Sequence, residues 1–530
     1  MTVAAERTVL AVARTVTSTL RVLDGVASLS GDHRVQVVFA VNDSSPFAGG
    51  VQRLLDDSGA TVVPWPQAKR LSFDLVVTAS ENTELAGLDA PVLVLPHGVG
   101  FQKMLPDSRG TGQRLSGALR REDVQDRRVV VAVSHPIQAV QLVTHSPYLA
   151  GMTAVVVDPV CERLAATVWF RDRYRTALGV GDRGLVMLSS TWGRQSLLGR
   201  WPDLPTRLLA ELPVDEYQVA AVLHPNVWSG HGAWQVRSWL ARAREAGLMV
   251  MPPEGSWPAL LVAADCVIAD HGSVSLYAAA ADRPMLLAPF GDETVPETAI
   301  SMLGEAAARL DVSGSLRDQV IATVGEHHAG RYGEITTKAF AAPPAARSVR
   351  SVVYELLALS EPSYEPPMAG YPVPEPETLV PNAYAVYTRQ FTGGVEVRRF
   401  PAGVDAAATA PAGWRRYLAV DDREWDLRLL HSAAILVSRE PYVDGGQVRA
   451  REVLARLPGA GMTVAPTANG AMVTVRDGGQ VEARDPGRRW DPMLLAAVVW
   501  TVLQSDAPMA ESLAVRAGDL VSPVSLHRRE

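Results

Sequence analysis

Short apolar runs alternate with helix-like stretches along the first 160 residues. The runs expected to form strands are 8–13, 35–41, 61–64, 73–78, 92–95, 129–133 and 153–157, and a helix is expected over 48–58. These runs are apolar on both faces, and helical stretches separate several of them. This pattern is typical of a parallel sheet with both faces covered.

The same rhythm restarts after residue 160. Strands are expected at 184–188, 218–223, 248–251, 266–269 and 285–288, and helices at 171–180, 202–212, 234–246 and 274–281. Two such series predict two facing Rossmann-like α/β domains, residues 1–160 and residues 161–360. Ligands of these sheets bind at the carboxyl ends of the strands. The polar residues that follow each strand are therefore the candidates for a site.

A Pro-rich segment, residues 361–380, separates these domains from the rest of the chain. Its prolines favour an extended, semi-rigid linker. Residues 381–530 are expected to form a smaller α+β domain, a candidate for binding a protein partner or for self-association. The elements expected there are a hairpin over 384–400, helices over 425–436, 446–457 and 491–504, and strands within 462–484.

Charge and composition argue against a nucleic-acid partner, a membrane span and secretion. The net charge of the chain is −7, and because phosphate binding normally needs a basic surface, we expect no nucleic-acid partner. The late apolar run 493–503 is shorter than the roughly 20 residues of a membrane span, which leaves at most peripheral membrane contact. The chain has only two cysteines and opens on no signal-peptide pattern, so we expect a cytoplasmic protein.

Some chemistries are disfavoured by the motifs that the sequence lacks. No G-x-x-x-x-G-K-[ST] and no G-x-S-x-G occurs, which argues against a P-loop and against the α/β-hydrolase mechanism. The segment GDRG, residues 181–184, is interpreted as a simple turn. His224, His231 and His271 have no established zinc-ligand spacing. We therefore expect neither a cofactor nor a metal ion.

The first candidate residue is His97, in the segment PVLVLPHGVG. An apolar strand delivers this histidine into a loop that also contains Gly98 and Gly100. Imidazole titrates near neutral pH, so a histidine at the carboxyl end of a strand could take a proton from an attacking hydroxyl. The alternative is a structural histidine that caps the strand, and position alone leaves both open.

Two strand ends in the second series carry further polar groups. Ser190, Thr191 and Arg194 follow the strand expected at 184–188, and their hydroxyls and guanidinium could hold a diphosphate. Ordinary turns share this composition. His224 ends the next strand, where Pro225 makes helical geometry unfavourable. An isolated histidine of this kind is more often structural than catalytic.

The last candidate is the turn Asp270, His271, Gly272 and Ser273, which precedes an Ala-rich helix. Ser273 is the expected N-cap of that helix, whose N-terminus favours an anion. Asp270 or His271 could reach the cleft. A strand, a polar turn, a small-residue helix and a further strand occur here in the order that a nucleotide-diphosphate site requires.

Taken in order, these segments resemble the CDP-glycerol glycerophosphotransferase family, the GT-B-fold polymerases and primases of teichoic acid synthesis. The residues that carry the resemblance are His97-Gly98, Arg175 to Gly179, Thr191-Trp192, His224-Pro225 and Asp270 to Ser273. The resemblance covers roughly residues 85–300. It implies a GT-B-like pair of facing Rossmann-like domains, followed here by the smaller α+β domain.

The resemblance also implies roles. His97 would be the general base, His224 and Ser273 would contact the pyrophosphate of the donor, and Asp270 would help to position the donor or its ribose. His271-Gly272 stands where the family has Tyr-Ser, and the helix VSLYAAAA lacks the acidic residues of the family. The donor pocket is therefore expected to differ from that of the family.

Three hypotheses of function follow. The leading one is a glycosyltransferase-like or glycerophosphotransferase-like enzyme, which transfers a group from a nucleotide-diphosphate donor to a hydroxyl acceptor. The second is a non-catalytic GT-B-like protein that binds a nucleotide or a partner. The third is a UDP-sugar epimerase, which would need paired carboxylates and a basic residue in the cleft.

Overall fold

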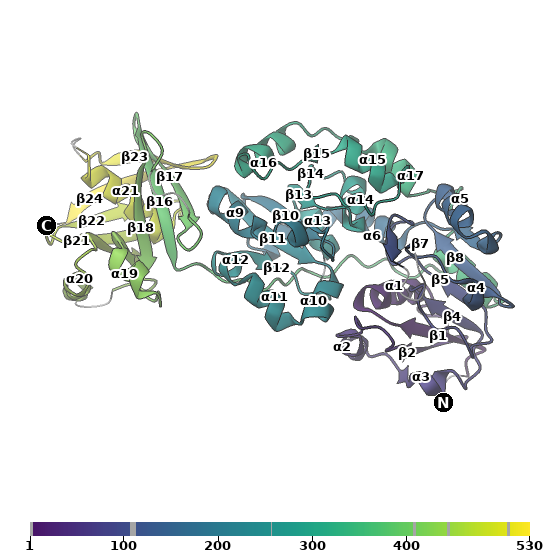
Figure 1. The fold of residues 1–530 in the computed structure, drawn as a ribbon. Coiled ribbons are helices and arrows are strands. Elements are labelled where there is room, and N and C mark those ends of the chain that lie inside the picture. The colour runs from purple at the N-terminus through teal and green to yellow at the C-terminus, as the bar shows by residue number, and fades with distance from the viewer. Residues whose placement is uncertain are drawn as a thin grey trace.

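The structure is a computed structural model and describes residues 4–106, 113–255, 257–405, 410–442, 446–505 and 509–529. Two α/β domains lie next to each other, and a β-rich domain lies on the far side of the second one (Figure 1). A long extended segment leads from the α/β pair to the β-rich domain (Figure 1).

The sheet of the first domain is parallel and has the strand order β3-β2-β1-β4-β5-β8-β9. Its strands are β1 (Arg7–Ala13), β2 (Val35–Val41), β3 (Val62–Val63), β4 (Leu75–Thr78), β5 (Val92–Val94), β8 (Val129–Val133) and β9 (Thr153–Val155). Each apolar run of the first series is thus confirmed as a strand. The order reverses between β1 and β4, and open α/β sheets bind their ligands beside such a switch point.

Helices cover both faces of this sheet. They are α1 (Val16–Ala27), α2 (Val51–Asp57), α3 (Trp65–Ala68), α4 (Arg121–Val124) and α5 (Pro136–His145), with a 3₁₀ turn at Pro147–Leu149 and a small hairpin of β6 (Met104–Pro106) and β7 (Gln113–Leu115). Helix α1 begins directly after β1, because the side chains of Thr15 and Ser18 cap each other's backbone N–H groups.

The second domain repeats this plan with the strand order β12-β11-β10-β13-β14-β15. Its strands are β10 (Gly184–Ser190), β11 (Tyr217–Leu223), β12 (Met249–Val250), β13 (Cys266–Ala269), β14 (Met285–Leu287) and β15 (Ala308–Arg309). The five predicted strands are confirmed, and the sheet gains β15, a strand of two residues that the sequence pattern did not indicate. The reversal here lies between β10 and β13.

The helices of the second domain surround its sheet. They are α6 (Pro159–Thr167), α7 (Arg171–Ala177), α8 (Leu197–Arg200), α9 (Leu204–Glu211), α10 (Pro225–His231), α11 (Ala233–Trp239), α12 (Ala241–Glu245), α13 (Trp257–Ala263), α14 (Ser273–Ala280), α15 (Ala299–Ala306), α16 (Leu316–Gly325) and α17 (Gly333–Ala339), with a 3₁₀ turn at Val168–Phe170. The single helix predicted over 234–246 is wrong in one respect. It divides into α11 and α12 at Leu240, whose ψ of 3° interrupts the helical path.

Residues 179–184 read GVGDRG and so have the spacing G-x-G-x-x-G. In the dinucleotide-binding fingerprint, these glycines follow a strand and open a helix. Here they do the opposite, because they leave helix α7 and enter strand β10. Gly179 and Gly181 both have a φ of 60°, so the segment is a pair of tight turns and not a phosphate-binding loop.

After α17 the chain returns to the first domain. Helix α18 (Val349–Leu356) packs with the core of the first sheet through Val352, Val353 and Tyr354. The predicted second domain, residues 161–360, includes the residues of this helix, although no helix was predicted there. Its apolar spacing shows that it is amphipathic, but that spacing is the same whichever sheet receives the helix.

The C-terminal domain is a closed barrel with the strand order β16-β17-β23-β24-β22-β21-β20-β19-β18. Its strands are β16 (Ala383–Phe391), β17 (Gly394–Pro401), β18 (Arg415–Asp421), β19 (Ile435–Val437), β20 (Met462–Thr467), β21 (Gly470–Val475), β22 (Gln480–Arg484), β23 (Ser512–Ala517) and β24 (Leu520–Arg529). Helices α19 (Leu427–Ser432) and α20 (Gly446–Arg456) lie outside (Figure 1). The predicted hairpin, the predicted strands within 462–484 and the α+β class are confirmed.

Helix α21 (Pro492–Leu503) forms the core of the barrel, and its residues from Met493 to Val499 are buried among the strands. The helix predicted over 425–436 is wrong in its second half. Residues from Ile435 to Val437 form β19, because this apolar run, which has a β-branched residue at each end, is buried between β18 and β20. Within the described ranges, no helix is both long enough and apolar enough to cross a membrane.

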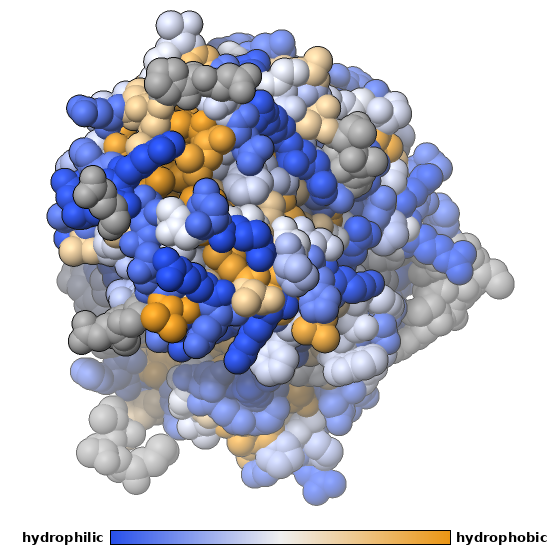
Figure 2. All heavy atoms as spheres, turned by 90° about the vertical axis from the view of Figure 1, so that its left-hand side faces the viewer, coloured by the Kyte–Doolittle hydropathy of each residue, from blue (hydrophilic) through white to orange (hydrophobic). Residues whose placement is uncertain are grey.

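The outer face of the barrel domain is mostly hydrophilic, with separate smaller apolar areas (Figure 2). Its opposite side is attached to the second domain. Arg399 of β17 donates to Asp215 of the second domain at 3.1 Å and to Asp491, the N-cap of α21, at 2.9 Å. Val404 adds to this contact by joining the core that covers the second sheet.

We predict that Arg399→Met destabilises the protein by about 3 kcal/mol, because it leaves Asp215 without its buried cationic partner. Urea denaturation of the full chain measures this loss. Arg428→Met is the matched control, since its side chain is 90% exposed and its loss is expected to cost at most about 0.5 kcal/mol. Equal effects of the two substitutions would show that Arg399 does not hold the domains together.

Candidate functional site

A cavity of about 880 Å³ lies between the two α/β domains. Its first wall consists of the segments that follow β1, β2, β4 and β5, and its second wall consists of the segments that follow β10, β11, β12, β13 and β14. The carboxyl ends of both sheets therefore face the same space, as expected for two Rossmann-like domains.

Seven of the nine residues predicted for the site line this cavity. They are His97, Ser190, Thr191, His224, His271, Gly272 and Ser273. Asp270 and Arg194 are not among the lining residues, since Asp270 is buried behind the wall and Arg194 lies at the surface. The contacts of each residue show which side chains remain available to a ligand.

His97 has a buried carboxylate behind it. Its Nδ1 lies 3.8 Å from Oε2 of Glu81, whose other oxygen is 3.3 Å from Nη1 of Arg114. Burial raises the pKa of Glu81, but the neighbouring His97 and Arg114 outweigh it and hold the pKa below its usual range. Glu81 is thus an anion at neutral pH, while the His97 side chain is 41% exposed and open to the cavity.

His224 faces His97 from the second wall. Its Nδ1 accepts the backbone N–H of Asn226 at 3.1 Å, which caps α10 and leaves Nε2 to carry the proton. Burial, together with the nearby charges of His97 and Lys103, lowers the pKa of His224 to about 3. His224 is therefore a neutral imidazole that can donate from Nε2 to a ligand oxygen.

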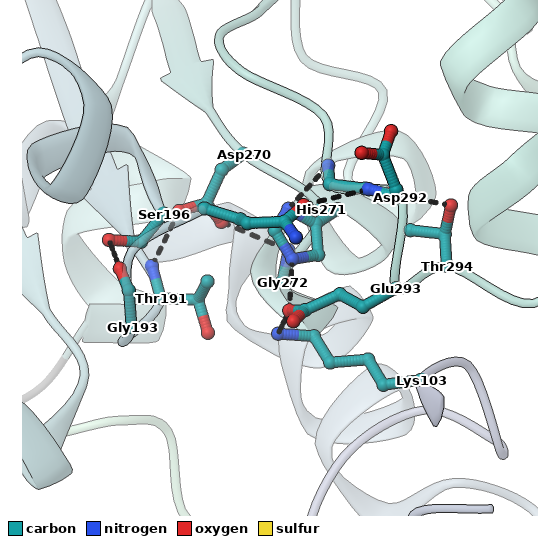
Figure 3. A network of polar contacts seen from close by, with 12 residues as sticks. Lys103, Thr191, Gly193, Ser196, Asp270, His271, Gly272, Asp292, Glu293 and Thr294 are labelled. Carbon is teal, nitrogen blue, oxygen red and sulfur yellow. Dashed lines mark hydrogen bonds and ion pairs between the residues drawn. The ribbon is translucent and has the colours of Figure 1, made fainter. Parts of the chain in front are cut away.

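Asp270 is used inside the second domain and does not reach the cavity. Its carboxylate accepts the backbone N–H groups of Thr191 at 2.8 Å and Gly272 at 3.0 Å (Figure 3). It also accepts the backbone N–H of Leu197 at 2.9 Å. These bonds join the loop after β10 to the turn after β13. Asp270 therefore shapes the wall, and the expectation that it contacts the donor or its ribose gains no support from this geometry.

His271 is also held by protein partners, since it is fully buried and donates from Nε2 to Oε1 of Glu293 at 2.7 Å. Its Nδ1 accepts the N–H of Gly291 at 3.3 Å, which fixes this tautomer. The hydrogen bond from His271 lowers the pKa of Glu293 against the effect of burial, and Lys103 adds to this. Nζ of Lys103, which comes from the first domain, is 3.2 Å from the same oxygen (Figure 3).

Ser273 is the first residue of α14, and Gly272 is its N-cap, so the prediction of Ser273 as the N-cap is wrong. The hydroxyl of Ser273 accepts the N–H of Val99 from the first domain at 3.0 Å. A Cβ at position 98 would lie 2.5 Å from this hydroxyl, so a larger residue there would displace the Ser273 side chain from its hydrogen bond with Val99. Backbone pairing of Lys103 with Thr294 continues the contact.

Sequence analysis missed several residues of the cavity. Arg14, Glu81 and Glu293 follow strands β1, β4 and β14, so the rule that selected His97 could have found them. Arg21, Lys103 and Arg114 carry no comparable local signal, because they reach the cavity only through the tertiary fold. Among the described residues, no group of three or more His, Cys, Asp or Glu side chains is arranged to hold a metal ion.

We predict that wild-type stability falls relative to His224→Asn as the pH is lowered from 7 to 4. The unfolded state takes up a proton near the ordinary histidine pKa of about 6.5, whereas folded His224 resists protonation down to about pH 3. Asn preserves the cap of α10 without titrating. Urea denaturation across this pH range tests the prediction, and a pH-independent difference between the two proteins would contradict it.

No protein-family model matches the chain, and no curated protein matches it in sequence. Solved structures do resemble it in fold. The wall teichoic acid polymerase TagF is 10% identical with a TM-score of 0.45, and the match covers 67% of this chain and 89% of TagF. MnaA of S. aureus, solved with UDP, is 13% identical with a TM-score of 0.42, over 67% of this chain and 99% of MnaA.

A third similar structure is HepE of Anabaena, solved in complex with UDP and glucose. It is 12% identical with a TM-score of 0.37, and the match covers 66% of this chain and 99% of HepE. Independently of these likenesses, the two parallel sheets and the cavity between them form the GT-B-like pair of facing Rossmann-like domains that the sequence predicted. At these identities the likeness is one of fold alone.

Proposed function

We propose that this protein is a transferase that uses a nucleotide-diphosphate-activated donor and passes a glycosyl or glycerophosphoryl group to a hydroxyl acceptor. The observation that carries the proposal is the position of His97. It opens into the cavity from the first domain, has the ionised Glu81 behind it, and faces the neutral donor His224 of the second domain.

In the proposed step, the imidazole of His97 takes the proton of the acceptor hydroxyl as its oxygen attacks the activated carbon or phosphorus of the donor. The bond from that atom to the bridging phosphate oxygen breaks. The nucleotide leaves with the bonding electron pair, as a diphosphate after glycosyl transfer or a monophosphate after glycerophosphoryl transfer. Glu81 stabilises the positive charge that His97 acquires.

The second wall supports the departing phosphate in this proposal. The Nε2–H of His224 and the hydroxyl of Ser273, at the start of α14, are hydrogen-bond donors. Both groups are uncharged, so burying them does not carry the desolvation penalty of a buried charge. Fixed donors of this kind stabilise the charge that develops on a leaving group. Epimerisation is less well supported, because both lining carboxylates already have ion-pair partners. Glu81 pairs with Arg114, and Glu293 pairs with His271 and Lys103.

We predict that His97→Ala lowers kcat of transfer by about 100-fold to 10,000-fold and leaves donor affinity nearly unchanged. Donors are first identified by thermal shift with CDP-glycerol and with UDP-, GDP- and CDP-sugars, and transfer is then assayed. Exposed His145→Ala on α5 is the matched control. Full activity of His97→Ala would rule out this base. Binding of none of these donors at millimolar concentration would reject the proposed function.

We further predict that Glu81→Gln lowers kcat by about 10-fold to 100-fold, less than the loss of His97 itself. The separation of 3.8 Å makes Glu81 an electrostatic partner and not a tight hydrogen-bond partner of His97. Gln removes the negative charge that stabilises His97 once it has taken the acceptor proton, so kcat falls while KM for the donor stays nearly unchanged. Steady-state kinetics measure this split, and an unchanged kcat would show that Glu81 acts only on Arg114.

A further inference from the structure

The charges that line the cavity are distributed unevenly between its two walls. Among the described lining residues, the Arg and Lys side chains all come from the first domain and are Arg14, Arg21, Lys103 and Arg114. The lining carboxylates are Glu81 and Glu293. The cavity therefore has an excess of positive groups within a chain whose net charge is −7, and this excess favours an anionic ligand.

The second wall offers donors without charge. His224 is neutral, because its pKa is lowered to about 3 by burial and by the charges of His97 and Lys103. Ser273 already accepts the N–H of Val99, which leaves its own O–H to donate. Arg194, which the sequence predicted as the cation of this wall, is not among the lining residues.

Lys103 brings a first-domain cation to this neutral wall. Its side chain is 19% exposed, and its Nζ lies 3.2 Å from Oε1 of Glu293 (Figure 3). The positive charge of Lys103 acts on both His224 and Asp270 and contributes to the lowered pKa of His224. An ammonium group has three N–H donors, so Lys103 can keep Glu293 and also bind a ligand oxygen.

We propose that the phosphate charge of the ligand is neutralised from the first domain, by Lys103 and Arg14, across the cavity from the neutral donors of the second domain. This inference rests on the proposed function and identifies the cations of the same site. The anion would then bridge the two domains, and its binding would favour the arrangement in which the loop after β5 contacts the turn after β13.

Isothermal titration of the full chain tests this with UDP, CDP, inorganic pyrophosphate, glycerol 3-phosphate and the uncharged nucleosides uridine and cytidine. Lys103→Gln and Arg14→Gln are each expected to weaken UDP, CDP and pyrophosphate about tenfold, with nucleoside affinity unchanged. Lys103→Arg keeps the charge and is expected to restore most of the affinity. Lys338→Gln is the matched control, on α17 and outside the lining residues.

The outcomes separate this inference from the proposed function. If the wild type binds UDP or CDP and both Gln variants bind these nucleotides as tightly as the wild type does, the inference is wrong and the proposed function stands.

Two other outcomes also overturn the inference. Equal weakening of nucleoside and diphosphate binding would mean that Lys103 only supports the fold. Weakening of glycerol 3-phosphate binding alone would place the cations at an acceptor site. Lys103-dependent binding of pyrophosphate without nucleotide binding would support the inference and reject the nucleotide donor. Binding of neither would reject both.

Discussion

The contact between the loop after β5 and the turn after β13 determines the shape of the whole site. Val99 donates to Ser273 across the domain boundary, Lys103 reaches Glu293, and backbone pairing with Thr294 extends the contact. A Cβ at position 98 would lie 2.5 Å from the hydroxyl of Ser273, so Gly98 lets this hydroxyl accept the N–H of Val99. Because this loop also carries His97, the same contact that joins the domains places the candidate base opposite His224.

Two buried polar residues that the sequence suggested as ligand-binding groups, Asp270 and His271, instead stabilise the loops that form this contact. Asp270 accepts three backbone N–H groups and so fixes the two loops of the second wall relative to each other. His271 holds Glu293, which in turn holds Lys103. A buried polar group without partners is costly, so groups with this many partners have little left to offer a ligand. The exposed His97 and the half-satisfied His224 remain for chemistry.

The barrel domain is attached to the second domain on the side away from the first one (Figure 1). The buried ion pair between Arg399 and Asp215 and the insertion of Val404 hold it there. The chain therefore combines an α/β pair built around a cavity with a domain whose core is filled by its own helix α21.

Local sequence patterns were enough to predict every strand of the first α/β sheet, all strands of the second except β15, and the polar residues at the carboxyl ends of these strands. Apolar runs covered on both faces have a local signature, and the polar residue that ends such a run lies at the ligand edge of the sheet. His97, His224 and Ser273 could be predicted for this reason, and Glu81 would have followed from the same rule. Three features depend on how distant segments pack: which side chains face the cavity, the return of α18 to the first sheet, and the closure of the barrel. These outcomes depend on pairs far apart in the chain, such as Val99 and Ser273, 174 residues apart, which no local pattern records.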